Sequence, residues 1–209
     1  PGYQVTFALM LTSAIITCTL TTRLKDHAKM SAQAAFRTKI LFDTNQLLQR
    51  AKSEEEIFSL TASQLIKLLN RSLIVYPEQN GDLGSEQFFG VDGETAQNIF
   101  SAPEERDAAN WTFANKKRSG AGTDSYPDAK GLYLALRTGG GVFGVVGIDL
   151  SEKPLDAFEN SVLLSILGEG ALAIENRRNA LEKEQATVQA KNEELRANLL
   201  RTISHDLRT

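Results

Sequence analysis

The fold is decided by one stretch of the chain, residues 131–150, which reads GLYLALRTGGGVFGVVGIDL. Two runs of aliphatic, β-branched and aromatic residues flank the glycine-rich segment Thr138–Gly141. Such runs favour strands, and a glycine-rich turn between them is typical of a β-hairpin. Gly144 and Gly147 lie inside the second run and predict a bulge or the close approach of a neighbouring group. The sequence therefore predicts an antiparallel hairpin.

A further strand is predicted upstream of the hairpin. Residues 72–76, SLIVY, form a short apolar run rich in strand-forming residues. We expect Pro77 and the turn-like residues after it to close this strand. Residues 81–93 are predicted to be a loop, in which Phe88 and Phe89 serve as a packing anchor.

Helical periodicity surrounds the predicted sheet. Residues 94–117 predict a helix that starts or breaks near Pro103. Residues 155–174 predict a helix that packs on the sheet. The spacing of apolar residues between positions 28 and 70 predicts two helices. The second should begin after Ser53, an N-cap residue followed by three glutamates.

Composition limits the possible functions. The 209 residues are 42% hydrophobic, which is enough for one domain core plus extensions. Lys and Arg number 23 against 26 Asp and Glu, so no overall basic field points to nucleic acid. Cys18 is the single cysteine, and no Cys/His cluster has zinc-ligand spacing. We expect no internal disulfide, no metal site and no nucleic-acid partner.

Residues 1–22 contain no Asp, Glu, Lys, Arg or His and are largely apolar. A helix of about 20 residues spans about 30 Å, the thickness of the hydrocarbon core of a bilayer. The threonines lower the hydrophobicity, but their hydroxyls can bond to carbonyls of the same helix. The sequence therefore predicts a transmembrane helix at residues 1–22.

The positive charge follows this apolar stretch, at Arg23, Lys25 and Lys29. A signal peptide carries its positive charge before the apolar stretch, so the order argues against export. Under the positive-inside rule, residues after about 22 are cytoplasmic. The unusual start Pro1-Gly2 suggests the last of several spans in a longer protein, cut at both ends. A buried helix of a soluble core is the competing interpretation.

The last part of the chain predicts a marginal coiled coil. Apolar residues and one threonine recur every seven residues, at Ile174, Leu181, Val188, Leu195 and Thr202. The complementary seam is polar until Leu199, with Arg178, Gln185 and Asn192. A weak seam suits a helix that exchanges between two registers. The alternative is a charged, solvated helix.

The chain ends with His205-Asp206-Leu207-Arg208-Thr209. A neutral imidazole is a good nucleophile near physiological pH, and His205 lies beside the heptad seam, where another domain could reach it. The five residues resemble the H-box of sensor histidine kinases. The resemblance implies that His205 is the phosphoacceptor and Asp206 the general base. It also implies that Thr209, with Asp206, positions water for dephosphorylation of a response regulator.

A second resemblance covers the middle of the chain. It rests on Trp111-Thr112-Phe113-Ala114-Asn115, on Gly120-Ala121-Gly122-Thr123-Asp124 with Pro127, and on residues 130–136. These segments resemble the GAF domain of KdpD-type, potassium-responsive sensor histidine kinases. The chain departs from that pattern mildly, with Ser125 for the usual threonine and Ala135 for the usual proline.

The resemblance implies an α+β GAF-like domain, an antiparallel sheet flanked by helices, preceded by a transmembrane helix and followed by a coiled-coil dimerisation helix. The expected parts are a transmembrane helix (1–22), a juxtamembrane helix (23–52), the GAF-like domain (53–170), a signalling helix (171–198) and the start of the phosphoacceptor domain (199–209).

The GAF-like part raises the question of a ligand. Trp111, Thr123, Asp124 and Tyr133 could converge on a pocket. We favour the alternative that Trp111 is a core residue and that the Gly-Thr-Asp segment forms a turn, since a fold does not fix function. The domain has no cysteine to attach a bilin and no histidine to hold a haem. We assign no ligand.

The function implied by both resemblances is phosphotransfer in a bacterial inner-membrane sensor kinase. Its partners would be a KdpE-type response regulator and a second copy of the chain, and its signal would be potassium limitation. The chain has no Gly-x-x-x-x-Gly-Lys-Ser/Thr loop. ATP with Mg²⁺ is therefore expected on a catalytic domain that this chain lacks. The alternatives are a membrane-anchored GAF ligand-binding regulator without kinase activity, and a structural coiled-coil dimeriser.

Overall fold

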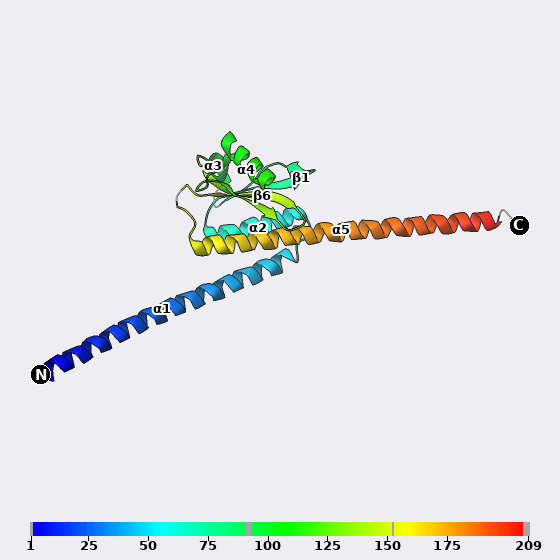
Figure 1. The fold of residues 1–209 in the computed structure, drawn as a ribbon. Coiled ribbons are helices and arrows are strands. Elements are labelled where there is room, and N and C mark those ends of the chain that lie inside the picture. The colour runs from blue at the N-terminus through cyan, green and yellow to red at the C-terminus, as the bar shows by residue number, and fades with distance from the viewer. Residues whose placement is uncertain (1, 91–92, 152, 207–209) are drawn as a thin grey trace. The chain divides into compact units, whose positions relative to one another are not determined.

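The computed structural model describes residues 2–90, 93–151 and 153–206 (Figure 1). The chain divides into two compact units, residues 1–43 and 44–209. The first unit consists of most of helix α1 (Gly2–Leu48). The second contains the end of α1, a sheet, four further helices and the C-terminal end of the chain.

Helix α1 is unbroken from Gly2 to Leu48, as expected for a helix that continues from residues 1–22. Its threonines behave as predicted, because the hydroxyls of Thr17, Thr21 and Thr22 each donate to the carbonyl four residues earlier, at 2.7–2.9 Å. This bonding satisfies the hydroxyl donor within the helix itself.

Large apolar side chains are exposed along the first half of α1. Those at least half exposed are Tyr3, Phe7, Met10, Ile15, Ile16, Leu20 and Leu24. Several other side chains among residues 1–11 lie outside the described part, so the span at 1–22 stays a prediction. By length and composition, the described residues contain one helix able to cross a membrane, 157–198, and 39% of its apolar window is buried within the protein.

The second unit is built on an antiparallel sheet. Its strands follow the order β2-β1-β6-β5-β4, and β3 also pairs with β1. The strands are β1 (Leu73–Gln79), β2 (Asp82–Leu83), β3 (Gln87–Phe89), β4 (Ser119–Gly120), β5 (Gly131–Arg137) and β6 (Val142–Asp149). Helices α2 (Glu54–Leu69) and α5 (Ala157–Asp206) cover one face, and α3 (Gly93–Phe100) and α4 (Pro103–Asn115) cover the other (Figure 1).

The predicted hairpin is confirmed, with β5 and β6 paired from Gly131↔Asp149 to Arg137↔Val142. The two glycines of β6 are sites of close approach, as predicted. A Cβ on Gly144 would lie 2.7 Å from the Tyr76 carbonyl oxygen, and one on Gly147 would lie 2.6 Å from Ile74 Cγ2. The irregularity in the ladder falls elsewhere, between Leu136 and Arg137.

Two expectations about residues 77–93 were wrong. Strand β1 continues through Pro77 to Gln79, and Pro77 pairs with Gly144 of β6. Asn80 and Gly81, both with positive φ, form a tight turn into β2, and β3 follows. An Asn-Gly turn between short strands is a hairpin signal, so part of the predicted loop is sheet.

The start of α2 is confirmed at Ser53, whose hydroxyl accepts a hydrogen bond from the Glu56 N–H at 3.2 Å. The Glu56 carboxylate reaches back and accepts from the Lys52 N–H at 2.7 Å. The cap therefore satisfies two backbone donors. Pro103 begins α4, as predicted for a helix interrupted there.

Replacing Ser53 with alanine should destabilise the domain by about 1 kcal/mol, because the Glu56 N–H loses its acceptor. Urea unfolding followed by the fluorescence of Trp111 measures this loss. Ser59→Ala, an exposed position within α2, should leave the midpoint nearly unchanged. Equal effects of the two substitutions would contradict a capping role.

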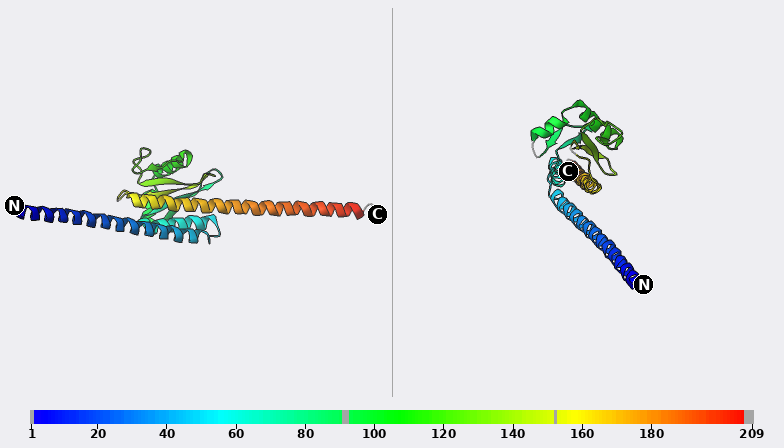
Figure 2. Two further views of the ribbon diagram at one scale, coloured as in Figure 1. Left: turned by 60° about the horizontal axis from the view of Figure 1, so that its bottom comes forward. Right: turned by 90° about the vertical axis from the view of Figure 1, so that its left-hand side faces the viewer.

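Helix α5 packs on the sheet, as predicted. Its inward residues are at most 3% exposed: Val162, Leu163, Ile166, Leu167, Ala171 and Ile174. For the valine, leucines and isoleucines among them, burial contributes about 1.5–3 kcal/mol each. The same helix then continues beyond the sheet to Asp206 (Figure 2).

Candidate functional site

The helix that carries the predicted phosphoacceptor is the helix that packs on the sheet. Helix α5 has no break from Ala157 to Asp206, so the backbone of His205 and Asp206 belongs to its last turn. The side chains of these two residues, and all of Thr209, lie outside the described part. A rotation or shift of α5 at the sheet would therefore reach His205 through continuous helix.

The predicted heptad stripe begins in the core and emerges from it. Ile174 is fully buried, whereas Leu181, Val188 and Leu195 are 37%, 56% and 56% exposed. Exposed apolar side chains repeating every seven residues are typical of a helix that pairs with another helix.

Arg178 ties α5 to the domain where the stripe emerges. Its guanidinium donates to the Glu54 carboxylate at the start of α2, at 2.9 and 3.0 Å. It also donates to the Glu78 carboxylate on β1 at 2.7 Å. The guanidinium carbon lies 5.3 Å from the ring centroid of Phe143. The sequence placed Arg178 only in a polar seam, so this role was missed.

The charges of this cluster support one another. The hydrogen bond to Glu54 raises the pKa of Arg178 despite partial burial, and Glu78 adds to the effect. Burial acts to raise the pKa of Glu78, but hydrogen bonds from Arg178 and the Gly81 N–H, with the Arg178 charge, lower it overall. Both partners are therefore held in their charged forms.

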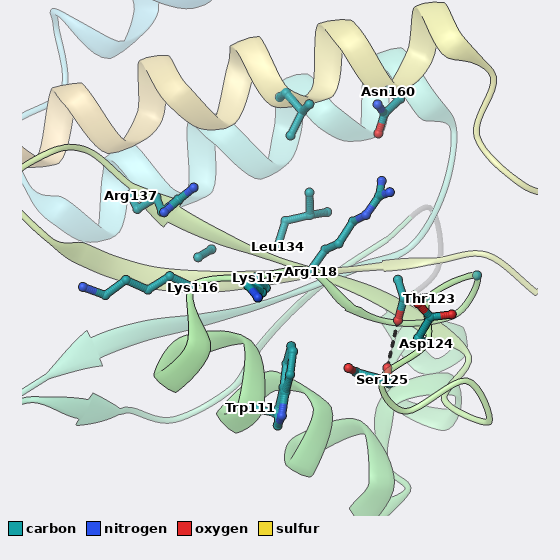
Figure 3. A pocket seen from close by; sticks show the side chains of 13 residues that line it. Trp111, Lys116, Lys117, Arg118, Thr123, Asp124, Ser125, Leu134, Arg137 and Asn160 are labelled. Carbon is teal, nitrogen blue, oxygen red and sulfur yellow. Dashed lines mark hydrogen bonds between the residues drawn. The ribbon is translucent and has the colours of Figure 1, made fainter.

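Three of the four candidate ligand residues meet at one pocket of about 780 Å³ (Figure 3). Trp111, Thr123 and Asp124 line it. Trp111 is half-buried, so the expectation that it is a core residue was wrong. Tyr133 lies elsewhere, because it is fully buried and its hydroxyl donates to Glu105 at 2.7 Å. Burial raises the pKa of Tyr133.

Glu105 fixes the strand that forms one wall of this pocket. Its carboxylate accepts from the Lys130 and Gly131 N–H groups, at 2.7 and 3.1 Å, and from Tyr133. These bonds satisfy a carboxyl group that is only 2% exposed, as a buried polar group requires. They attach the start of β5 to α4.

The loop on another side of the pocket is held by its own hydrogen bonds. Gly120 has φ +91°, and the Thr123 hydroxyl bonds to the carbonyls of Gly120 and Ser125, at 2.8 Å each. The expected turn chemistry of this segment is confirmed. Ser119, just before it, donates to the Ala108 carbonyl of α4 at 2.8 Å. The loop is thus shaped before any ligand arrives.

The sequence did not anticipate the basic side chains of this pocket. Lys116, Lys117 and Arg118 follow α4, and Arg137 ends β5. The run Lys-Lys-Arg directly after the Trp-x-Phe-x-Asn segment was a visible signal. The sequence does not show that this run lies near Arg137, because the two are brought together by the pairing of β4 with β5.

Two known proteins align with all or nearly all of this chain. No protein-family model matches it. The sensor protein KdpD of Clostridium acetobutylicum is 33% identical over 209 residues, and that of Escherichia coli is 28% identical over 210. The alignments cover 100% and 99% of this chain but 23% and 22% of those proteins. The chain thus spans less than a quarter of the curated relatives it matches.

Solved structures agree on the fold. The GAF domain of the potassium sensor histidine kinase KdpD from Escherichia coli matches with a TM-score of 0.50 and 18% identity, over 70% of this chain and 98% of that one. A GAF domain from Pseudomonas syringae pv. tomato matches with a TM-score of 0.53 and 19% identity, over 76% and 97%. These structures show a GAF fold, and together with the two sensor-protein alignments they support a KdpD-type segment, as the resemblance in the sequence implied.

Proposed function

We propose that the chain is the central segment of a membrane-bound two-component sensor histidine kinase, which relays a signal through its GAF domain to His205. The observation that carries this proposal is the unbroken helix α5, which packs on the sheet and extends to the H-box. The similarity of the whole of this chain to a segment of KdpD sensor proteins supports it.

The proposed chemistry is phosphoryl transfer. An imidazole nitrogen of His205 attacks the γ-phosphorus of ATP, ADP leaves, and Asp206 accepts the imidazole proton. ATP and its Mg²⁺ would be bound by a catalytic domain outside this chain. The phosphoryl group then passes to an aspartate of a KdpE-type response regulator. Asp206 and Thr209 would position water for the opposing dephosphorylation.

Membrane attachment, dimerisation and the signal belong to the same proposal. Residues 1–22 would cross the bacterial inner membrane and place the rest in the cytoplasm, as their lack of charge and the following basic residues favour. The exposed stripe of Leu181, Val188 and Leu195 would pair with the same stripe of a second copy. Potassium limitation is the signal that the resemblance in the sequence implies.

The test joins the chain to a sensor-kinase catalytic domain and supplies ATP labelled at the γ-phosphate. We expect acid-labile label on the wild type and on His27→Gln, which alters the other histidine. His205→Gln should carry none. Label that survives in His205→Gln would exclude His205 as the acceptor. A complete absence of label on the wild type would favour a GAF ligand-binding regulator, for which the 780 Å³ pocket offers a site.

A further inference from the structure

Four basic side chains line the pocket beside β5: Lys116, Lys117, Arg118 and Arg137. All four residues are exposed. None of them forms a salt bridge with any residue that the structure describes. Asp124 is the only carboxylate of the lining. In a chain of net charge −3, this is a local excess of unpaired positive charge, which attracts anions.

The backbone positions of these cations are fixed by different elements. Lys116 ends α4 in a left-handed conformation, with its N–H donating to the Thr112 carbonyl at 2.9 Å. Arg137 ends β5, and Arg118 extends from the loop toward the side where Asn160 of α5 lies (Figure 3). Because the backbone is fixed at these positions, the ordering entropy lost on binding is confined to the side chains.

The pocket also has an apolar component. The half-buried ring of Trp111 lines it, together with Leu134 of β5 and Leu164 of α5. Leu164 is 50% exposed, so apolar surface there remains in contact with water. An indole ring offers a flat surface on which a planar group can stack.

The position of the pocket differs from that of the domain core. Between the sheet and helices α3 and α4, Tyr76, Tyr133 and Phe100 are at most 3% exposed and fill the space. The pocket lies instead at the sheet edge, where β4 pairs with only Leu132 and Tyr133 of β5. A ligand can therefore enter without disturbing the core.

We propose that this pocket binds a small organic dianion, a phosphate monoester with a flat apolar body that packs against Trp111. The positive charge of the lining attracts its phosphate, and charge-assisted hydrogen bonds from arginine and lysine are the strong contacts that this lining offers. The Asn160 amide supplies a further polar contact. This inference concerns binding alone and does not depend on phosphorylation of His205.

The test uses the 209-residue chain in detergent micelles and phenyl phosphate as the probe. Trp111 is the only tryptophan, so its fluorescence reports directly on the pocket. We expect a saturable change with a Kd in the millimolar range or tighter. Arg118→Gln combined with Arg137→Gln should weaken binding about tenfold or more. Lys183→Gln with Lys191→Gln, which removes the same charge from the exposed part of α5, should leave the affinity unchanged.

Calorimetry separates the contribution of the ring from that of the charge. Inorganic phosphate should bind the wild type more weakly than phenyl phosphate does. In Trp111→Leu, the affinities for the two probes should be closer to each other. Circular dichroism checks that each variant is folded. If the double variant of Arg118 and Arg137 does not fold, the double variant Lys116→Gln with Lys117→Gln takes its place in the test. No saturable binding of phenyl phosphate, or equal affinity in the wild type and the charge-neutralised pocket, would overturn the proposal.

Discussion

Replacing Gly120 with alanine is expected to destabilise the GAF domain by about 3 kcal/mol, or roughly 6–12 °C in Tm. Two independent penalties combine at this position. The φ of Gly120 is +91°, which side chains other than glycine rarely adopt, and an added Cβ would overlap the Gly131 carbonyl oxygen. That oxygen accepts the Ala121 N–H at 2.9 Å, so β4 cannot move away without losing its pairing with β5.

Two other glycines serve as graded controls for this prediction. Gly122 has φ +73° but open space around its Cα, so alanine there should cost only the conformational penalty, about 1–2 kcal/mol. Gly139 has open space and no positive φ, and alanine there should change stability little. Urea unfolding, monitored by Trp111 fluorescence, measures the stability of the three alanine variants and ranks them. If Gly120→Ala is no worse than Gly122→Ala, the steric part of the explanation is wrong.

Replacing Arg178 with glutamine should remove about 2 kcal/mol of stability at neutral pH, because two partly buried carboxylates lose their partner. The side chain of Glu78 is 14% exposed and that of Glu54 is 27% exposed, so solvent compensates only in part. The substitution should also loosen α5 at the point where the heptad stripe emerges. Hydrogen exchange of residues 174–185 should therefore accelerate.

The effect of Arg178→Gln should depend on pH. The folded-state pKa of Glu78 is lowered below the usual 4.5, so its contribution to stability is complete above the unfolded value and is lost as pH falls through the folded value. As pH falls, the wild type should thus lose more stability than Arg178→Gln does. The difference in their free energies of unfolding should become smaller. Arg177→Gln is the matched control, since Arg177 forms no ion pair with the described residues. If the stability difference between the wild type and Arg178→Gln stays constant from neutral to acid pH, the role of Glu78 is contradicted.

The sequence predicted the parts of the fold that depend on local chemistry. The hairpin follows from two strand-forming runs around a glycine turn, and Ser53 is recognisable as a cap because its partner Glu56 is three residues away. Strand β1 was predicted too short, because proline normally ends a strand. Pro77 is tolerated here since its place in the ladder needs only its carbonyl, which accepts from the Gly84 N–H at 2.8 Å.

The candidate site was less accessible to sequence reasoning, because it depends on contacts between distant residues. Trp111 and Tyr133 are similar aromatic candidates in sequence, yet one lines the pocket and the other is buried against Glu105. Trp111 lies on α4 beside the pocket, whereas the side chain of Tyr133, on β5, lies in the core with Ala108 and Ala109 of α4. Arg178 resembles any polar helix residue until Glu54 and Glu78 are brought to it from more than 90 residues away.

Coupling between the GAF domain and His205 through α5 is tested most directly by changing the length of the helix. Deleting residues 182–188 turns the segment beyond by about 20° relative to the domain, whereas deleting residues 184 and 185 turns it by about 200°. The readout is acid-labile phosphate on His205, in the chain joined to a catalytic domain. We expect the seven-residue deletion to keep the wild-type level and the two-residue deletion to change it strongly. Equal phosphate in both deletions, or none on His205 in the intact protein, would contradict the proposed relay.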